Sequence, residues 1–391
     1  MSWILAVPVS AGLLLAQHSA AVERAWDLVA RGDRAQAVRV LRAAIEANPG
    51  DADARLLLGS VLVEQGDRTG ALSQLSEAVR LRPRSSEAQN ALGEALHDAG
   101  RAGEARAAFE KAASLDANFA QAHVNLGMVL AEAGEFEPAA RHLDRAIALL
   151  GRTPDAAYPH YLRAKVYSAR ADAQHAAAEL TLAVALRPDF AEAWSDLGQA
   201  RKTLLDDRGA LPAFERAVEL KPDDAVARYR LGAQQLRLGN ARAAIPQLEK
   251  ALDLDAENQS ALYSLQVALR REGQTGKAEQ VKERLAALLR ERDKARQNAV
   301  RAVELNNAGA ALEKGGNLRA ALEKYQAALA LYPEHIGIRV NVAAALLHLG
   351  HWNQGIEELR EAVRRDPGNA TIRAALDAAL AQAPAGTTSP E

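Results

Sequence analysis

The side chains best able to do chemistry in this 391-residue chain are scattered, and they form no catalytic motif. The sequence has no cysteine and nine histidines, which excludes a cysteine nucleophile and a thiolate metal site. His348 and His351 are the closest histidines, but Gly350 lies between them at an expected helix end. No HExxH, GxSxG or GxxxxGK[ST] motif occurs, and no GxGxxG follows a strand. We therefore expect no catalytic residue, no metal and no cofactor.

The balance of charged residues indicates which class of binding partner to expect. Lys and Arg number 48 against 50 Asp and Glu, which gives a formal net charge of −2. A nucleic-acid-binding protein needs a basic surface, so this class is not expected. The hydrophobic fraction of 49% is too high for a generally disordered chain. These values favour a folded protein whose partner is another protein or a peptide of unknown identity.

The amino terminus carries an apolar run, residues 3–16, without any charge. It is shorter than the about 20 residues that a membrane-spanning helix needs, and it has the length of a signal-peptide apolar region. Small residues follow at Ser19, Ala20 and Ala21, although no Lys or Arg precedes the run. We expect residues 1–21 to be a signal peptide and the protein to be exported by a bacterium, into the periplasm or the medium. The alternative is an uncleaved apolar segment, either an anchor or a cap on the first repeat, with a cytoplasmic protein as one outcome.

The chain repeats with a period of 34 residues. Pro49 and Pro83 are 34 residues apart, and the same spacing separates Pro188 from Pro222 and Pro333 from Pro367. With these prolines at position 32, ten units begin at residues 18, 52, 86, 120, 157, 191, 225, 259, 302 and 336. Positions 20 and 27, which were not used to set the frame, are Ala in nine of the ten units. The period is therefore a property of the chain and predicts a repeat architecture.

Each unit has the pattern of two helices. In the second unit, Leu58 and Leu62 have helical spacing and Gly66 interrupts the pattern. A second apolar face follows through Leu75, and Pro83 ends it. Small residues at positions 8 and 20 allow the two helices to approach closely, because a larger side chain there would separate them.

This pattern resembles the tetratricopeptide repeat family. Unit six carries the family's residue types most completely, with Trp194, Leu197, Gly198, Ala210, Phe214, Ala217 and Pro222. The resemblance implies an all-α fold, a right-handed superhelical solenoid of antiparallel helix pairs. It also implies a concave groove that is lined by the first helices, binds peptides or partner proteins, and is not catalytic.

The frame divides the chain into segments. Residues 22–292 hold units one to eight, residues 302–369 hold units nine and ten, and residues 370–382 are expected to form a capping helix. The insert at 293–301 overlaps a charged stretch (290–298) that has no Gly or Pro, which favours an extension of the preceding helix over a loop. We expect a change of superhelical pitch there, a smaller irregularity at Pro154–Ala156, and a disordered tail at 383–391.

Three sets of side chains are expected on the groove, because the resemblance places positions 2, 5, 6, 9, 12 and 13 there. Tyrosines suit protein interfaces, charges at position 13 change from acidic to basic along the array, and asparagines can hold a ligand's backbone. Packing against the next repeat, or a solvated rim, remains the alternative for each set. The candidate partner-binding residues are Tyr158, Tyr161, Tyr229, Tyr263, Arg237, Arg271, Lys314, Asn125, Asn307 and Asn341.

The sequence therefore predicts a non-catalytic protein-interaction scaffold, with units five to nine as the favoured binding region. An accessory subunit of an envelope-assembly or glycosyltransferase complex is the alternative. A self-associating structural array is a third hypothesis. No stable membrane span is expected, and the oligomeric state is left open.

Export gives the first testable prediction. If residues 1–21 are a signal peptide, amino-terminal sequencing of the native protein will begin near residue 21 or 22. A soluble cytoplasmic chain that still begins at Met1 would contradict it.

Overall fold

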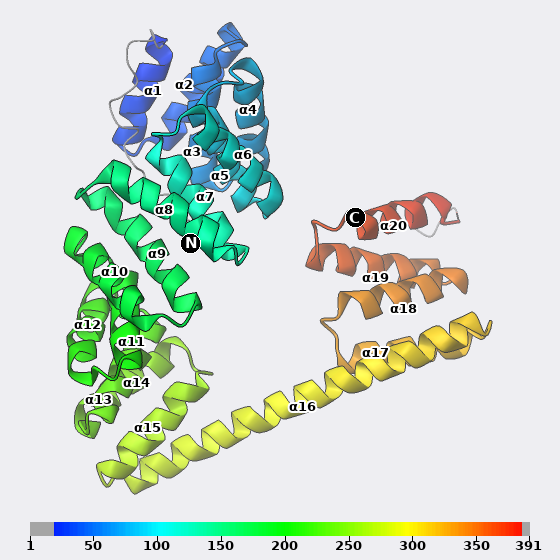
Figure 1. Ribbon diagram of the computed structural model, residues 1–391. Helices are drawn as coiled ribbons and strands as arrows, with labels where there is room; N and C mark the ends of the chain where they lie inside the picture. Colours follow the sequence, from blue (N-terminus) through cyan, green and yellow to red (C-terminus); the bar gives the residue numbers. More distant parts are fainter. Residues whose placement is uncertain (1–18, 385–391) are drawn as a thin grey trace. The chain divides into compact units, whose positions relative to one another are not determined.

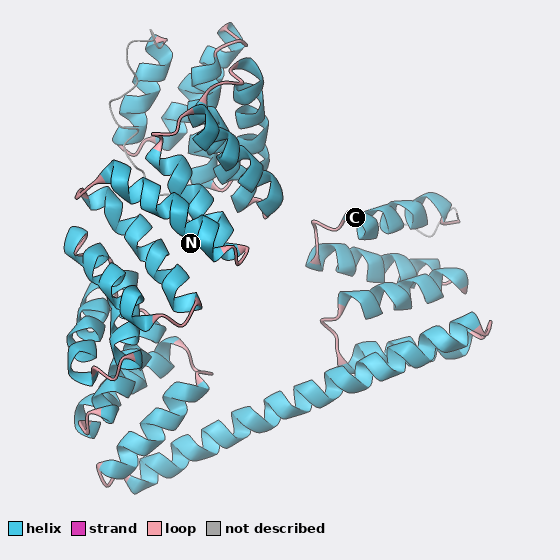
Figure 2. Cartoon of the chain, in the orientation of Figure 1, coloured by secondary structure: helices cyan, strands magenta, loops and turns pink. Residues whose placement is uncertain are grey.

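The computed structural model describes residues 19–384, and every regular element in this range is a helix (Figure 2). The predicted signal segment lies almost wholly outside the described residues, as do residues 385–391 of the predicted tail. The described residues form twenty α-helices and one short 3-10 helix, η1, which are labelled in part in Figure 1. The chain divides into two compact units after Gln274. The predicted all-α fold of antiparallel helix pairs is confirmed.

The first compact unit holds the paired helices of repeats one to seven and the first helix of repeat eight. Repeats one to four comprise α1 (Ala20–Ala30), α2 (Arg34–Ala47), α3 (Ala52–Gln65), α4 (Arg68–Leu81), α5 (Ser86–Asp98), α6 (Ala102–Leu115), α7 (Ala120–Glu132) and α8 (Phe136–Leu150). After η1 (Pro154–Ala156) follow α9 (Ala157–Ala169), α10 (Ala173–Leu186), α11 (Ala191–Thr203), α12 (Asp207–Leu220), α13 (Ala225–Arg237), α14 (Ala241–Leu254) and α15 (Gln259–Arg271). The expected irregularity at 154–156 is thus one 3-10 turn.

The turns between paired helices are specified by a few local residues. Gly66 ends α3 with a φ of 79°, in the left-handed region that favours glycine. Asp67 then caps α4, because its carboxylate accepts a hydrogen bond of 2.9 Å from the amide of Gly70. The sequence Gly-Asp therefore ends one helix and begins the next, so the two helices run antiparallel.

Within a pair, the helices approach at a glycine that receives a large side chain. A Cβ atom added at Gly93 would lie 2.5 Å from Cε1 of Phe109, and one at Gly198 would lie 2.6 Å from Cε1 of Phe214. Both phenylalanines are buried, 0% and 1% exposed. The absence of a side chain at position 8 thus creates the space that position 24 fills.

Contacts between successive repeats distinguish the two helices of each pair. First helices touch the next first helix at α1–α3, α3–α5, α5–α7, α7–α9 and α13–α15, while each second helix packs on the first helix that follows it. Direct contact between first helices brings them together along one side of the first compact unit. The side chains of these first helices therefore share one surface of that unit, here called its inner surface.

The second compact unit begins with a helix that is longer than the sequence predicted. α16 (Thr275–Lys314) has 40 residues and joins the second helix of repeat eight, the charged insert and the first helix of repeat nine. The prediction extended the second helix of repeat eight into the insert, with repeat nine beginning as a new helix at residue 302. No residue from 275 to 314 breaks the helix, because Gly276 and Gly309 are its only glycines and it contains no proline.

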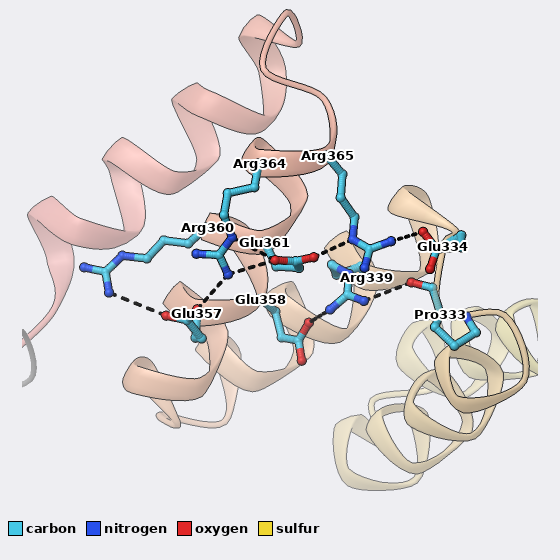
Figure 3. Close-up of polar contacts among 9 residues, drawn as sticks. All are labelled: Pro333, Glu334, Arg339, Glu357, Glu358, Arg360, Glu361, Arg364 and Arg365. Atoms are coloured by element: carbon cyan, nitrogen blue, oxygen red, sulfur yellow. Dashed lines mark hydrogen bonds and ion pairs between the residues drawn. The ribbon is translucent and has the colours of Figure 1, made fainter.

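The remaining helices of the second unit are held by apolar packing and an arginine–glutamate network. They are α17 (Leu318–Leu331), α18 (Ile336–His348), α19 (Trp352–Arg365) and α20 (Ala370–Gln382). Figure 3 shows Arg339 between Glu358 of α19 and the Pro333 carbonyl oxygen, which accepts a hydrogen bond of 2.9 Å from its guanidinium. α20 packs Ile372 and Ala379 against the apolar cluster around Leu359. It covers α19, as expected for a capping helix.

No helix among residues 19–384 combines the length and the apolar composition that a bilayer span requires.

Two glycines test the packing rule. Gly198→Ala should lower the free energy of unfolding by about 1–3 kcal/mol, because its new Cβ atom would collide with Phe214. Gly103→Ala should raise it by up to about 1 kcal/mol, because no atom lies within 4 Å of a Cβ atom there and α6 loses a flexible residue. Urea unfolding followed by circular dichroism measures both. Equal effects of the two substitutions would refute the rule.

Candidate functional site

An aromatic pocket of about 360 Å³ opens on the inner surface of the first compact unit. First helices α7, α9 and α11 supply most of its wall, together with the beginning of α8 and the residue that precedes α11. Its lining residues are Met128, Ala131, Glu132, Phe136, Tyr158, Tyr161, Leu162, Lys165, Val166, Ala169, Phe190 and Glu192. It therefore spans repeats four to six.

The aromatic rings of the pocket are fixed by contacts with one another. Tyr161 packs against Phe190 with ring centroids 4.8 Å apart, and Tyr158 stacks at 6.3 Å from Tyr161. The Tyr158 hydroxyl lies 3.8 Å from the sulfur of Met128, and the Arg187 guanidinium lies 3.9 Å from the Phe190 ring centroid. These contacts pre-organise an apolar wall that carries polar hydroxyl groups.

The turn before α11 places Phe190 in the pocket. Pro188 ends the preceding helix pair, and its carbonyl oxygen accepts a hydrogen bond of 2.9 Å from the Trp194 indole. Phe190 follows in the N-cap position of α11 and is 4% exposed. The side chain in the pocket thus depends on the same turn that fixes the repeat boundary.

Charges at the pocket are unequally paired. The Glu132 carboxylate lies 2.8 Å from the His97 imidazole, and Glu192 forms an ion pair with Lys221. Lys165 is exposed, its ammonium group lies 5.6 Å from the Tyr161 ring centroid, and it has no ion pair within residues 19–384. Lys165 is therefore the pocket charge that is available to an anionic group.

Tyr161 keeps its proton in this environment. Burial raises the pKa of its hydroxyl well above the ordinary value, and the nearby Asp196 carboxylate raises it further. Burial also raises the pKa of Tyr158. Both hydroxyls remain neutral hydrogen-bonding groups at any physiological pH.

The other two predicted tyrosines do not line this pocket. Tyr229 is half-buried on α13, and Tyr263 on α15 is 62% exposed. The sequence prediction missed Phe136 and Phe190, which lie in or beside turns, outside the positions assigned to the groove. Met128 and Lys165 are both at position 9, a groove position, and that column could have identified them.

The charges of position 13 join neighbouring repeats. The Arg237 guanidinium lies 2.7 Å from Asp207 at the start of α12, and Arg271 donates a hydrogen bond of 3.0 Å to the Leu236 carbonyl oxygen. At the acidic end, Glu64 pairs with Arg34 at 2.6 Å. Lys314 is exposed at the last residue of α16, in the second compact unit.

The predicted asparagine column also connects repeats. Asn125 is 5% exposed, and its amide group donates hydrogen bonds to Asn90 (3.0 Å) and Glu94 (2.9 Å). Its carbonyl oxygen accepts one from Gln121 at 3.0 Å. Asn341 likewise donates to Asn306 at 2.8 Å, whereas Asn307 is exposed on α16. Asn125 thus uses both amide hydrogens within the protein.

Three models of the tetratricopeptide repeat match the chain. One matches residues 28–95 and 312–384, a second matches 86–119, and a third matches 104–157. Among curated protein sequences, none matches significantly.

Solved structures of helical-repeat proteins align with parts of the chain at low sequence identity. PilF of Pseudomonas aeruginosa is 16% identical, with a TM-score of 0.50 over 54% of this chain and 94% of its own. PilW, a type IV pilus biogenesis factor, is 19% identical, with a TM-score of 0.49 over 53% and 95%. YrrB, described as a TPR protein with an unusual peptide-binding site, is 22% identical, with a TM-score of 0.41 over 49% and 96%.

The fold is that of an all-helical repeat protein. The chain belongs to the tetratricopeptide repeat family. Members of this family are generally non-catalytic scaffolds that bind peptides or proteins.

The cluster of Asn90, Glu94 and Asn125 makes a pH-dependent prediction. Burial raises the pKa of the Glu94 carboxyl above its ordinary 4.5, with a smaller contribution from Asp98, although both asparagine donors oppose the shift. When the pKa of a carboxyl is higher in the folded state than in the unfolded state, the folded protein becomes less stable as the pH rises through that pKa. Glu94→Gln should therefore be more stable than the parent at pH 7, and its advantage should shrink as the pH falls to 4.5.

Thermal unfolding of both proteins from pH 4 to 8 measures this difference. A constant difference across that range would show that Glu94 carries no desolvated charge.

Proposed function

We propose that the aromatic pocket binds an extended peptide through one bulky apolar side chain with an acidic group beside it. The observation that carries this proposal is the arrangement of Tyr158, Tyr161 and Phe190 around an open volume next to Lys165, which has no ion pair with any described residue. The aromatic wall matches an apolar side chain, and the ammonium group matches a carboxylate.

The volume suits a single side chain and its neighbouring backbone. A pocket of about 360 Å³ lies at the lower end of the range for small ligand sites. The neutral tyrosine hydroxyls can exchange hydrogen bonds with the peptide backbone, as the predicted asparagines would have done. Glu132 and Glu192 already have cationic or histidine partners, so they compete little for a basic ligand.

Charge reversal at Lys165 tests the recognition of an acid. Panning a phage-displayed peptide library on the immobilised chain should enrich an aromatic or large aliphatic residue next to Asp or Glu. The Lys165→Glu protein should enrich Lys or Arg in place of the acid, because the free pocket charge changes sign. Lys111→Glu, which reverses an exposed lysine on the second helix α6, should select the same motif as the parent protein.

Tyrosine replacement tests the apolar wall with the selected peptide. Tyr161→Ala should weaken binding by about 2 kcal/mol in isothermal titration, a value typical of a central aromatic contact. Tyr263→Ala removes the tyrosine at the same repeat position three units along, outside the pocket, and should leave the affinity unchanged. Equal affinity of the Tyr161→Ala and parent proteins, or one motif selected by both Lys165 charges, would refute the proposed site.

A further inference from the structure

The long helix α16 leaves a repeat-stacking surface without its usual partner. In an ordinary junction, the first helix of one repeat packs antiparallel on the second helix of the repeat before it. In α16 these two helices are successive parts of one continuous helix, with their axes in line. Residues 302–314 therefore cannot pack on residues 275–290 of the same chain, as long as α16 is intact.

The burial of individual positions shows the consequence. Position 7 is a buried leucine in five repeats: Leu58, Leu126, Leu197, Leu231 and Leu265. Its counterpart in repeat nine, Ala308, is exposed, and so is Ala311 at position 10. Elsewhere alanine at position 10 is buried, as in Ala95, Ala200, Ala268 and Ala345.

These residues differ from those of repeat one, the first repeat among the described residues. Positions 7 and 10 of repeat one are Arg24 and Asp27, which are charged and exposed. Repeat nine has alanine at both positions. Its position 10 thus has the residue type that is buried in repeats three, six, eight and ten.

Ion pairs elsewhere in the array define how a second helix meets the next first helix. Asp144 at position 25 of repeat four pairs with Arg163 at position 7 of repeat five. Glu137 at position 18 pairs with Arg170 at position 14 across the same junction, at 3.1 Å. At the equivalent positions of repeats eight and nine, Glu283 would face Ala308 and Gly276 would face Gly315.

Both matched pairs have one midpoint, which lies between Ala295 and Arg296. This midpoint is one residue from the centre of α16, whose bounds are Thr275 and Lys314. Two antiparallel copies of α16 that cross at this point would each place residues 275–290 on residues 302–314 of the other copy. The same contact would occur twice, related by a two-fold axis.

We propose that α16 is a self-association helix, which pairs antiparallel with α16 of a second copy of this chain about an axis near Ala295 and Arg296. Each copy supplies the helix that the other lacks at its junction between repeats eight and nine. The two-fold symmetry and the repeat register favour a second copy over an unrelated partner. This inference is independent of the proposed peptide pocket.

Opposite charges at one position test the register. Glu283 is exposed and forms no ion pair among residues 19–384. Ala308→Arg would place an arginine opposite Glu283 of the second copy, which reproduces the pairing of Arg163 with Asp144. Ala308→Glu would oppose two carboxylates instead. Within one chain, residues 283 and 308 are about 37 Å apart along the helix and cannot interact.

Sedimentation velocity of the full chain over a range of concentrations measures the result. The parent protein should form a dimer. Ala308→Arg should lower the dimer dissociation constant about threefold to tenfold, and Ala308→Glu should raise it by a similar factor, because each exposed pair occurs twice. Adding Glu283→Arg to Ala308→Glu should restore dimerisation, and circular dichroism should show unchanged helix content in all variants.

A parent protein that stays monomeric at every concentration would overturn the proposal. So would a shift in the same direction for Ala308→Arg and Ala308→Glu, because the charge of residue 308 would then not meet Glu283. A peptide-binding result, positive or negative, changes neither outcome, since the pocket lies in the first compact unit.

Discussion

The close approach of two helices at a residue without a side chain is the constraint on which six of the ten repeats depend, those with glycine at position 8. Gly93 and Gly198 lie within collision distance of buried phenylalanine rings, so the ring occupies the space that a Cβ atom would need. Alanine at positions 20 and 27 maintains the same short separation. Close packing within the pairs lets first helices of successive repeats meet, as at α7–α9, and the candidate pocket is built from three first helices.

Polar side chains on that surface serve first to join the repeats. Asn125 contacts Asn90 and Glu94 of the repeat before it, and Arg237 contacts Asp207. A groove residue with such partners is less available to a ligand, because binding would have to replace a hydrogen bond that the protein already makes. Lys165 differs from them, since its close contact is the face of Tyr161. Whether a groove side chain is available to a ligand thus depends on its neighbours in space. A comparison of residues at one repeat position does not reveal those neighbours.

This explains how much the sequence could predict. The 34-residue period predicted the helix pairs, because it reports local spacing and turn residues such as Gly66 and Pro83. The family resemblance placed Tyr158 and Tyr161 on the groove. It could not distinguish Tyr161 from Tyr263, which has the same repeat position but is exposed, because the pocket also needs Phe136 and Phe190 from turn segments. The sequence predicted only part of the continuous helix α16. The charged insert indicated a helical extension, but nothing indicated that the first helix of repeat nine would continue it.

At the insert, the 34-residue period no longer corresponds to a pair of helices joined by a turn. Elsewhere a turn reverses the chain, and each second helix packs on the next first helix. In α16 the same two segments keep their repeat sequences but lose the reversal, so the apolar stacking positions of repeat nine remain exposed at Ala308 and Ala311. An apolar surface that is specific for helix packing costs free energy in water. Antiparallel pairing of two such helices removes that cost without a turn, because the second chain provides the reversal that the first one lacks.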